Sequence, residues 1–283
     1  MGTTKTKKIG FIDYYLDEWH ANNYPALIRE ASGGELEVAY AYGMIDSPLP
    51  GGMTTDRWCE KYNIPRCLTI EELIEKSDCL LVLSPDNCEM HEQLCQLPLR
   101  SGKLTYVDKT FAPDKETAER LFALAEEYGT PCYSTSALRF ASEYQELDPA
   151  EITAINCWGP NDFNTYSIHQ LEPLMMLMKA EPDRVMWLDG EKWMTLAIHF
   201  RDGRSATVSC FGTGSPFVTN VAGREESRLI QVQSDFFRAF IEELCRFYRT
   251  GEVRVPHKDT VSIMAVRGAG LKAQQTPGVW VEI

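Results

Sequence analysis

Asp108 and Lys109 are the pair of residues whose types and position best suit a chemical role in this chain. They follow the apolar run of residues 104–107, and a helix signal begins shortly afterwards at Pro113 and Asp114. The pattern predicts a carboxylate and an ammonium at the carboxyl end of a buried strand, which is where open α/β sheets bind ligands. The alternative is a solvated pair of charges on a loop.

A second group of polar and aromatic residues follows the first apolar run, between residues 13 and 25. Aromatic rings that stack on C–H faces and polar groups that hold hydroxyls are typical of sugar sites, so Trp19 and His20 are candidate substrate contacts. Two other interpretations remain open. The segment could be a capped helix start whose aromatic rings fill the domain interface, or its carboxylates could hold a divalent cation.

The loop predicted over residues 158–164 carries Asn161 and Asp162, which are further candidate substrate contacts. We expect this loop to lie over a cleft.

Composition indicates an ordinary globular protein of one large or two modest domains, with 283 residues and 44% hydrophobic content. The 28 Lys and Arg residues against 41 Asp and Glu give a net charge of −13 without a basic cluster, which argues against nucleic-acid or membrane partners. The nine cysteines form no Cys-x-x-Cys pair, so we expect reduced core thiols, no metal site and a cytoplasmic location.

The first half of the chain alternates short apolar strands with helices. Strands are expected at residues 8–13, 36–42, 79–83, 104–107 and 132–137, with helices between them. This alternation predicts a Rossmann-like, doubly wound parallel sheet covered on both faces. We expect this α/β domain to span residues 1–139.

The second half is richer in strands, which are expected at residues 151–158, 184–188, 193–200, 206–211 and 227–233. Helices are expected near residues 167–179, 234–249 and 258–274. The pattern predicts an α+β domain with a mostly antiparallel sheet over residues 140–283. We expect the two domains to share an interface with a cleft between them.

In this order, the features resemble the Gfo/Idh/MocA family of sugar, polyol and inositol dehydrogenases. Residues 84–87 (Ser-Pro-Asp-Asn), with His91, are similar to the family's turn after a central strand. Asp108-Lys109-Thr110 stands where the family has Glu-Lys-Pro. His169, on the first helix of the second domain, stands where the family carries its catalytic histidine. The last helix and the strand near residue 280 match the family's closing elements.

The resemblance implies an oxidoreductase that uses NAD or NADP and acts on a sugar, polyol or cyclitol hydroxyl. Hydride transfer from an alcohol carbon needs a group that takes the hydroxyl proton and a cation that holds the oxygen. These roles fall to His169 and Lys109, with Asp108 positioning the lysine; the alternative for His169 is a helix histidine satisfied by Glu172. The implied cofactor contacts are Asp13, Tyr15, Ser84, Pro85, Asn87 and His91.

The turn after the first strand departs from the family's pattern. A dinucleotide turn needs glycines so that backbone N–H groups can approach the pyrophosphate, but no glycine occurs between Gly10 and Gly33. Asp13, Asp17 and Glu18 place carboxylates there instead. Two like charges about 4 Å apart cost about 4 kcal/mol at an effective dielectric of about 20, which opposes a bound phosphate.

Three further departures follow along the chain. The second strand ends in Tyr-Ala-Tyr-Gly without the usual ribose-binding acid, Thr165 replaces an aspartate, and Thr110 replaces a proline, so the Lys109–Thr110 bond is expected to be trans.

Two hypotheses about function result. The first is an oxidoreductase with an altered cofactor site, and the second is a cofactor-free carbohydrate-binding or regulatory protein, or a non-redox lyase or isomerase. We expect a homodimer or homotetramer assembled through the open face of the second sheet.

Overall fold

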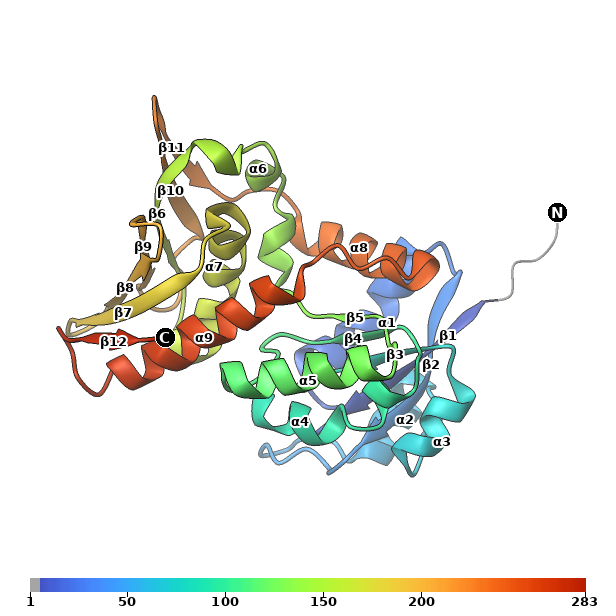
Figure 1. Cartoon of the computed structure of the whole chain (residues 1–283). Helices are drawn as coiled ribbons and strands as arrows, with labels where there is room; N and C mark the ends of the chain where they lie inside the picture. Colours follow the sequence, from blue (N-terminus) through green and yellow to red (C-terminus); the bar gives the residue numbers. More distant parts are fainter. Residues whose placement is uncertain (1–5) are drawn as a thin grey trace. The chain divides into compact units, whose positions relative to one another are not determined.

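The computed structural model describes residues 6–283, which form two compact units (Figure 1). The first unit contains residues 6–112 with Glu119–Ser134 and Ile241–Pro256. The second contains Pro113–Ala118, Thr135–Phe240 and His257–Ile283. The chain therefore passes between the units more than once, and each unit is described separately.

The first unit is built on a five-stranded parallel sheet in the order β2-β1-β3-β4-β5. Strand β3 is buried throughout, and β1 is buried over its last five residues, as expected for a sheet covered on both faces. The predicted doubly wound α/β fold is confirmed. The strands are β1 Lys7–Asp13, β2 Leu36–Gly43, β3 Cys79–Val82, β4 Thr105–Val107 and β5 Cys132–Tyr133.

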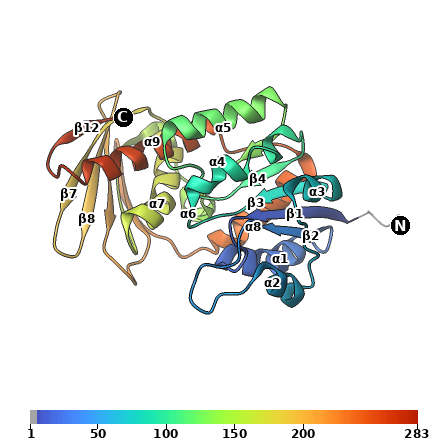
Figure 2. The same cartoon turned by 90° about the horizontal axis from the view of Figure 1, so that it is seen from below.

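Helices flank this sheet, with α1 and α5 on opposite sides of it (Figure 2). Thr69 caps the N-terminus of α3, because its hydroxyl accepts the N–H of Glu72 at 3.1 Å. The helices of this half are α1 Trp19–Ala31, α2 Thr55–Tyr62, α3 Ile70–Lys76, α4 His91–Leu94 and α5 Lys115–Glu127, with short 3₁₀ turns at Cys88–Met90 and Pro98–Arg100.

The second unit is built on a seven-stranded sheet in the order β11-β10-β6-β9-β8-β7-β12. All its neighbouring pairs are antiparallel except β6 with β9, so the predicted α+β architecture is confirmed. Strand β10 was not predicted. The strands are β6 Ile152–Gly159, β7 Pro182–Asp189, β8 Met194–Phe200, β9 Ser205–Cys210, β10 Val218–Gly223, β11 Ser227–Gln231 and β12 Trp280–Glu282.

Helices α7 and α9 pack against the sheet of the second unit (Figure 1). Strand β8 alternates buried and half-exposed residues, which is typical of a sheet with one covered face. The helices after β5 are α6 Ser142–Gln145, α7 Phe163–Met178, α8 Phe236–Thr250 and α9 His257–Ala273, with 3₁₀ turns at Ala137–Phe140 and Pro149–Glu151.

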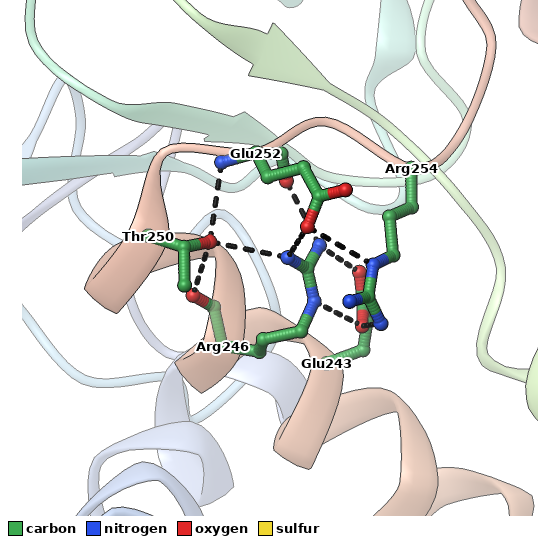
Figure 3. A network of polar contacts seen from close by, with 5 residues as sticks. All are labelled: Glu243, Arg246, Thr250, Glu252 and Arg254. Atoms are coloured by element: carbon green, nitrogen blue, oxygen red, sulfur yellow. Dashed lines mark hydrogen bonds and ion pairs between the residues drawn. The ribbon is translucent and has the colours of Figure 1, made fainter.

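The end of α8 is held in the first unit by a network of charged groups (Figure 3). Arg246 donates two hydrogen bonds to Glu243 at 2.6 and 2.7 Å, and others to Thr250 and Glu252 at 3.1 and 2.8 Å. Gly251 reverses the chain with a φ of 73°, a left-handed conformation that favours glycine. The network thus fixes the path of the chain as it leaves the helix.

Within residues 6–283, no helix is long and apolar enough to cross a membrane. The nine cysteines are free thiols, and all except Cys88 are buried.

Candidate active site

His20 and Asp108 form a hydrogen-bonded pair at the carboxyl edge of the parallel sheet. His20 lies in the first turn of α1, and Asp108 directly follows β4. The His20 ring contacts a carboxylate oxygen of Asp108 through Nδ1, and it stacks on Tyr24 with ring centroids 5.0 Å apart. Asp108 is completely buried, whereas the His20 side chain is 13% exposed. The structure therefore joins two candidates that the sequence placed in separate groups.

The charge on Asp108 is stabilised by its surroundings. Burial raises the pKa of its carboxyl, but the charge and hydrogen bond of His20, together with Lys109, outweigh burial and hold the pKa below the usual range. The hydroxyl of Tyr106 contacts the other carboxylate oxygen at 3.4 Å. A buried carboxylate that stays ionised can orient an imidazole and stabilise its protonated form.

Glu18 caps the N-terminus of α1 with its side chain. One carboxylate oxygen accepts the N–H of His20 at 2.7 Å, and the other accepts the N–H of Ala21. Burial raises the Glu18 pKa to about 7, although the His20 charge and the two backbone hydrogen bonds lower it in part. The segment therefore begins a helix whose first turn is capped by a carboxylate.

Asp13, the last residue of β1, is 1% exposed. Neither of its carboxylate oxygens has a hydrogen-bond partner within residues 6–283. Burial, followed by the charge of Glu18, raises its pKa well above the ordinary value, while the backbone near Tyr14 and Tyr15 lowers it in part. A buried carboxyl without partners is more stable when protonated, because a lone charge is costly to desolvate.

The other predicted residues of this turn are divided between the interior and the surface. Tyr15 is 7% exposed, while Trp19 is 55% exposed, with its ring edge-on to His20 at 5.5 Å. Asp17 accepts the backbone N–H of Met53 at 2.8 Å and so holds the loop that follows β2. No group of three or more acidic, histidine or cysteine side chains within residues 6–283 could hold a metal ion.

The residues expected at the family's turn after β3 lie in a turn that begins with the buried Ser84 and includes the exposed Asp86. Ser84 has a φ of 92°, a strained value for a residue with a side chain, and its hydroxyl donates to the carbonyl of Asn87 at 3.0 Å. Pro85 and Asn87 are half-buried. His91 is fully buried, and its two ring nitrogens face the carbonyl oxygens of Phe111 and Leu83 at 3.0 and 2.6 Å.

Both ring nitrogens of His91 are therefore used in contacts within the protein interior. A neutral imidazole can donate to only one of the two carbonyl oxygens, and burial lowers the His91 pKa. His91 therefore ties the end of β3 to the segment after Lys109.

Lys109 is half-buried, and its ammonium has no hydrogen bond or ion pair within the described part of the chain. Its carboxylate neighbour, Asp108, is committed to His20. The Lys109–Thr110 peptide bond is cis, so the expectation of a trans bond, based on the missing proline, was wrong.

His169 lies on α7 in the second unit and contacts the hydroxyl of Ser136 through Nδ1 at 2.7 Å. Glu172, considered as its partner, instead binds Arg139 at 2.9 Å and the N–H of Ser136 at 3.1 Å. Burial raises the Glu172 pKa, while the Arg139 charge lowers it in part. Nothing in the sequence had indicated Ser136. Arg139 also binds Asp259 at 2.8 Å, so its ion pairs lie within one unit.

Asn161 and Asp162 lie at the N-terminus of α7, where they line a cavity of about 620 Å³ in the second unit. Asp162 caps α7 by accepting the N–H of Thr165 at 3.0 Å. The lining also includes Asp189, Lys192 and the exposed ring of Trp193. Aromatic and polar groups together are typical of sites for hydroxyl-bearing ligands.

Comparison with solved structures links this fold to cyclitol and sugar dehydrogenases. The myo-inositol 2-dehydrogenase of Lactobacillus plantarum matches with a TM-score of 0.77 and 12% identity, over 99% of this chain and 100% of that one. The scyllo-inositol dehydrogenase of Lactobacillus casei, with bound NAD(H) and scyllo-inositol, matches with a TM-score of 0.78 and 14% identity, over 98% and 99%.

GenD2 from gentamicin A biosynthesis, in complex with NAD, matches with a TM-score of 0.74 and 12% identity, over 100% of this chain and 98% of that one. Scans against protein-family models and against curated proteins found no match. The structural matches extend over both units and agree with the order of elements expected from the sequence. The chain thus has the two-domain fold of the Gfo/Idh/MocA-type oxidoreductases.

Proposed function

We propose that this protein is an enzyme that moves a proton at a hydroxyl- or carbonyl-bearing carbon of a sugar, polyol or cyclitol. Support for the substrate class comes from the fold, which is shared with inositol dehydrogenases. The second unit has its own cavity, lined by Asn161, Asp162 and Trp193, whose residue types also suit a hydroxyl-bearing ligand.

The hydrogen-bonded pair of His20 and Asp108 is the observation that carries this proposal. The buried Asp108 carboxylate holds Nδ1 of the ring, and Nε2 has no hydrogen-bond partner in the described part of the chain. An imidazole oriented in this way can accept a proton at Nε2 and return it, and general acid–base catalysis of this kind contributes about 10²- to 10⁴-fold.

Lys109 supplies the second element of the proposed chemistry. Its uncommitted ammonium directly follows Asp108 in the chain and can hold a substrate oxygen on which negative charge develops. His169 remains a proposed acid or base of the second unit, with Ser136 orienting its ring.

A nicotinamide dinucleotide, which the fold implies, does not fit the turn after β1. Its pyrophosphate needs the free N–H groups at the start of α1, and Glu18 already accepts two of them. Asp13 adds a second buried carboxyl where the fold needs glycine backbone.

Two reactions are compatible with the proposed proton transfer. Oxidation of a hydroxyl is supported by the fold of the dehydrogenases. Isomerisation or elimination beside a carbonyl is supported by the turn at Glu18, because it needs no hydride acceptor. In both cases His20 removes the proton next to the carbonyl and Lys109 holds the enolate oxygen. In isomerisation the proton returns to the former carbonyl carbon as the neighbouring hydroxyl loses its proton and becomes the new carbonyl. In elimination the enolate expels the hydroxyl on the next carbon, which takes the proton from His20 and leaves as water. The geometry favours this non-redox reaction.

Proton exchange tests the proposal directly. Wild-type protein is incubated in D₂O with keto sugars and keto-cyclitols, without cofactor, and exchange at carbon and product formation are followed by NMR. We expect turnover by the wild type and a rate about 10²- to 10⁴-fold lower for His20→Gln. His199→Gln is the matched control, since His199 pairs with Asp183 at 3.2 Å on the surface.

Two outcomes would contradict the proposal. An equal loss in both histidine variants would remove the special role of His20. Turnover of a polyol that requires NAD⁺ or NADP⁺, with no exchange in their absence, would establish the oxidoreductase instead.

A further inference from the structure

We propose that Glu18 occupies, from within the chain, the position at which this kind of sheet binds a dinucleotide phosphate, so that the turn after β1 excludes dinucleotides. The inference does not depend on the proposed activity, because it concerns binding alone.

The hydrogen bonds of Glu18 are those that a bound phosphate would make. Helix α1 extends over 13 residues from Trp19, and the N–H groups of its first turn carry the positive end of the helix dipole. The Glu18 carboxylate accepts the N–H groups of His20 and Ala21, and the N–H of Asn22 donates to the Glu18 carbonyl at 3.0 Å. An incoming phosphate would find these donors already used.

The burial of Glu18 distinguishes it from an ordinary helix cap. Ser, Thr, Asp and Asn are the common caps because their short side chains reach the first turn from the surface. Glu18 is instead a longer side chain that is only 7% exposed, and it lies with the carboxyls of Asp13 and Asp108. Its carboxylate therefore lies inside the ligand-binding edge of the sheet.

Asp13 is the independent observation at this edge. It ends β1, is 1% exposed, and neither of its oxygens has a partner within residues 6–283. Burial, followed by the charge of Glu18, raises its pKa and so disfavours a negative charge here, and a phosphate would bring negative charge to the same place. The polar groups of this turn therefore repel an anion that the sheet would otherwise attract.

Removal of the Glu18 side chain should open the position. Glu18→Ser keeps a good helix cap and removes the carboxylate. Titrations with ADP, NADH and NADPH are followed by calorimetry, with circular dichroism to establish that each variant is folded. We expect no binding to the wild type at 1 mM ligand, and a gain in affinity of at least about 10-fold for Glu18→Ser with ADP.

Two further variants complete the test. If the serine variant is unstable, Glu18→Gln keeps one hydrogen-bond acceptor, removes the charge and gives the same readout. Glu75→Gln removes one charge from the exposed side of α3 and should behave as the wild type.

The inference is overturned if wild-type protein binds NADH or NADPH with a Kd below about 100 μM, a range that stabilises proteins measurably at millimolar ligand. It is equally overturned if folded Glu18 variants gain no affinity, or if Glu75→Gln gains as much. Each of these results leaves the proton transfer by His20 to be judged by its own experiment.

Discussion

His20 and Asp108 are separated by 88 positions in the sequence, yet they act as one unit in the fold. The sequence analysis identified both residues but could not pair them. The distance between the start of a helix and the end of a strand depends on how the sheet is assembled. The same holds for Glu18. Its carboxyl group indicated an acidic turn. That this carboxyl is buried and caps the helix depends on the path of the chain into α1.

Glu18 should make stability depend on pH. Its folded pKa of about 7 lies above the ordinary value of 4.5, so the folded state holds a proton that the unfolded chain releases. The stabilisation from this proton is complete below pH 4.5 and is lost as the pH rises to about 7. Relative to Glu18→Gln, we expect the wild type to lose about 3 kcal/mol of unfolding free energy over that range.

Urea denaturation at half-unit pH steps measures this difference. Glu75→Gln, on the exposed side of α3, controls for the loss of one negative charge. A constant difference between wild type and Glu18→Gln from pH 4.5 to 8 would mean that Glu18 carries no buried proton.

At the scale of elements, most strands and helices could be predicted from the sequence because their apolar periodicity is strong. Strand β2 begins where it was expected and ends one residue later, and β8 begins one residue later than expected. Strand β10 could not be found, since its sequence, Val-Thr-Asn-Val-Ala-Gly, has few large apolar residues and follows a segment that contains Gly212, Gly214 and Pro216. Its pairing with β6 and β11 supplies the order that the local sequence lacks.

The network at the end of α8 should depend on the shape of arginine as well as on its charge. Arg246 binds Glu243 through two N–H groups while a third nitrogen reaches Glu252 (Figure 3), and its side chain is 18% exposed. Lysine cannot reproduce this fork. We expect Arg246→Lys to lower the unfolding free energy by about 1–2 kcal/mol, measured by urea denaturation.

Arg228→Lys provides the comparison for this substitution. Arg228 pairs with Glu226 at 2.8 Å on the surface, with 56% and 67% of the two side chains exposed, so its replacement should cost less than about 0.5 kcal/mol. Equal effects in the two variants would mean that the Arg246 fork contributes no more than a surface ion pair.

At the scale of the whole molecule, the order of elements predicted the fold of both units. It did not establish which residues of the two units act on the same substrate. Lys109 belongs to the first unit and His169 to the second. Their convergence on one substrate therefore stays a prediction, and so does the catalytic role of His169. The pairing of His20 with Asp108 lies within one unit and provides the firmer basis for experiment.

We predict that copies of this chain assemble through the open face of the seven-stranded sheet. Thr195, Ala197 and His199 of β8 alternate with buried neighbours and are half-exposed. On this face the hydroxyls of Thr195 and Ser209 bind each other at 2.7 Å, so a second copy can cover them without leaving them unpaired. We expect a dimer or tetramer, and Ala197→Arg should yield a monomer of 32.1 kDa by light scattering.

Glu75→Arg, which adds an arginine on α3 in the other unit, should leave the assembly intact. A monomeric wild type, or an Ala197→Arg variant that still assembles, would show that this face is not the contact, because a buried arginine at its centre cannot be accommodated without a partner charge.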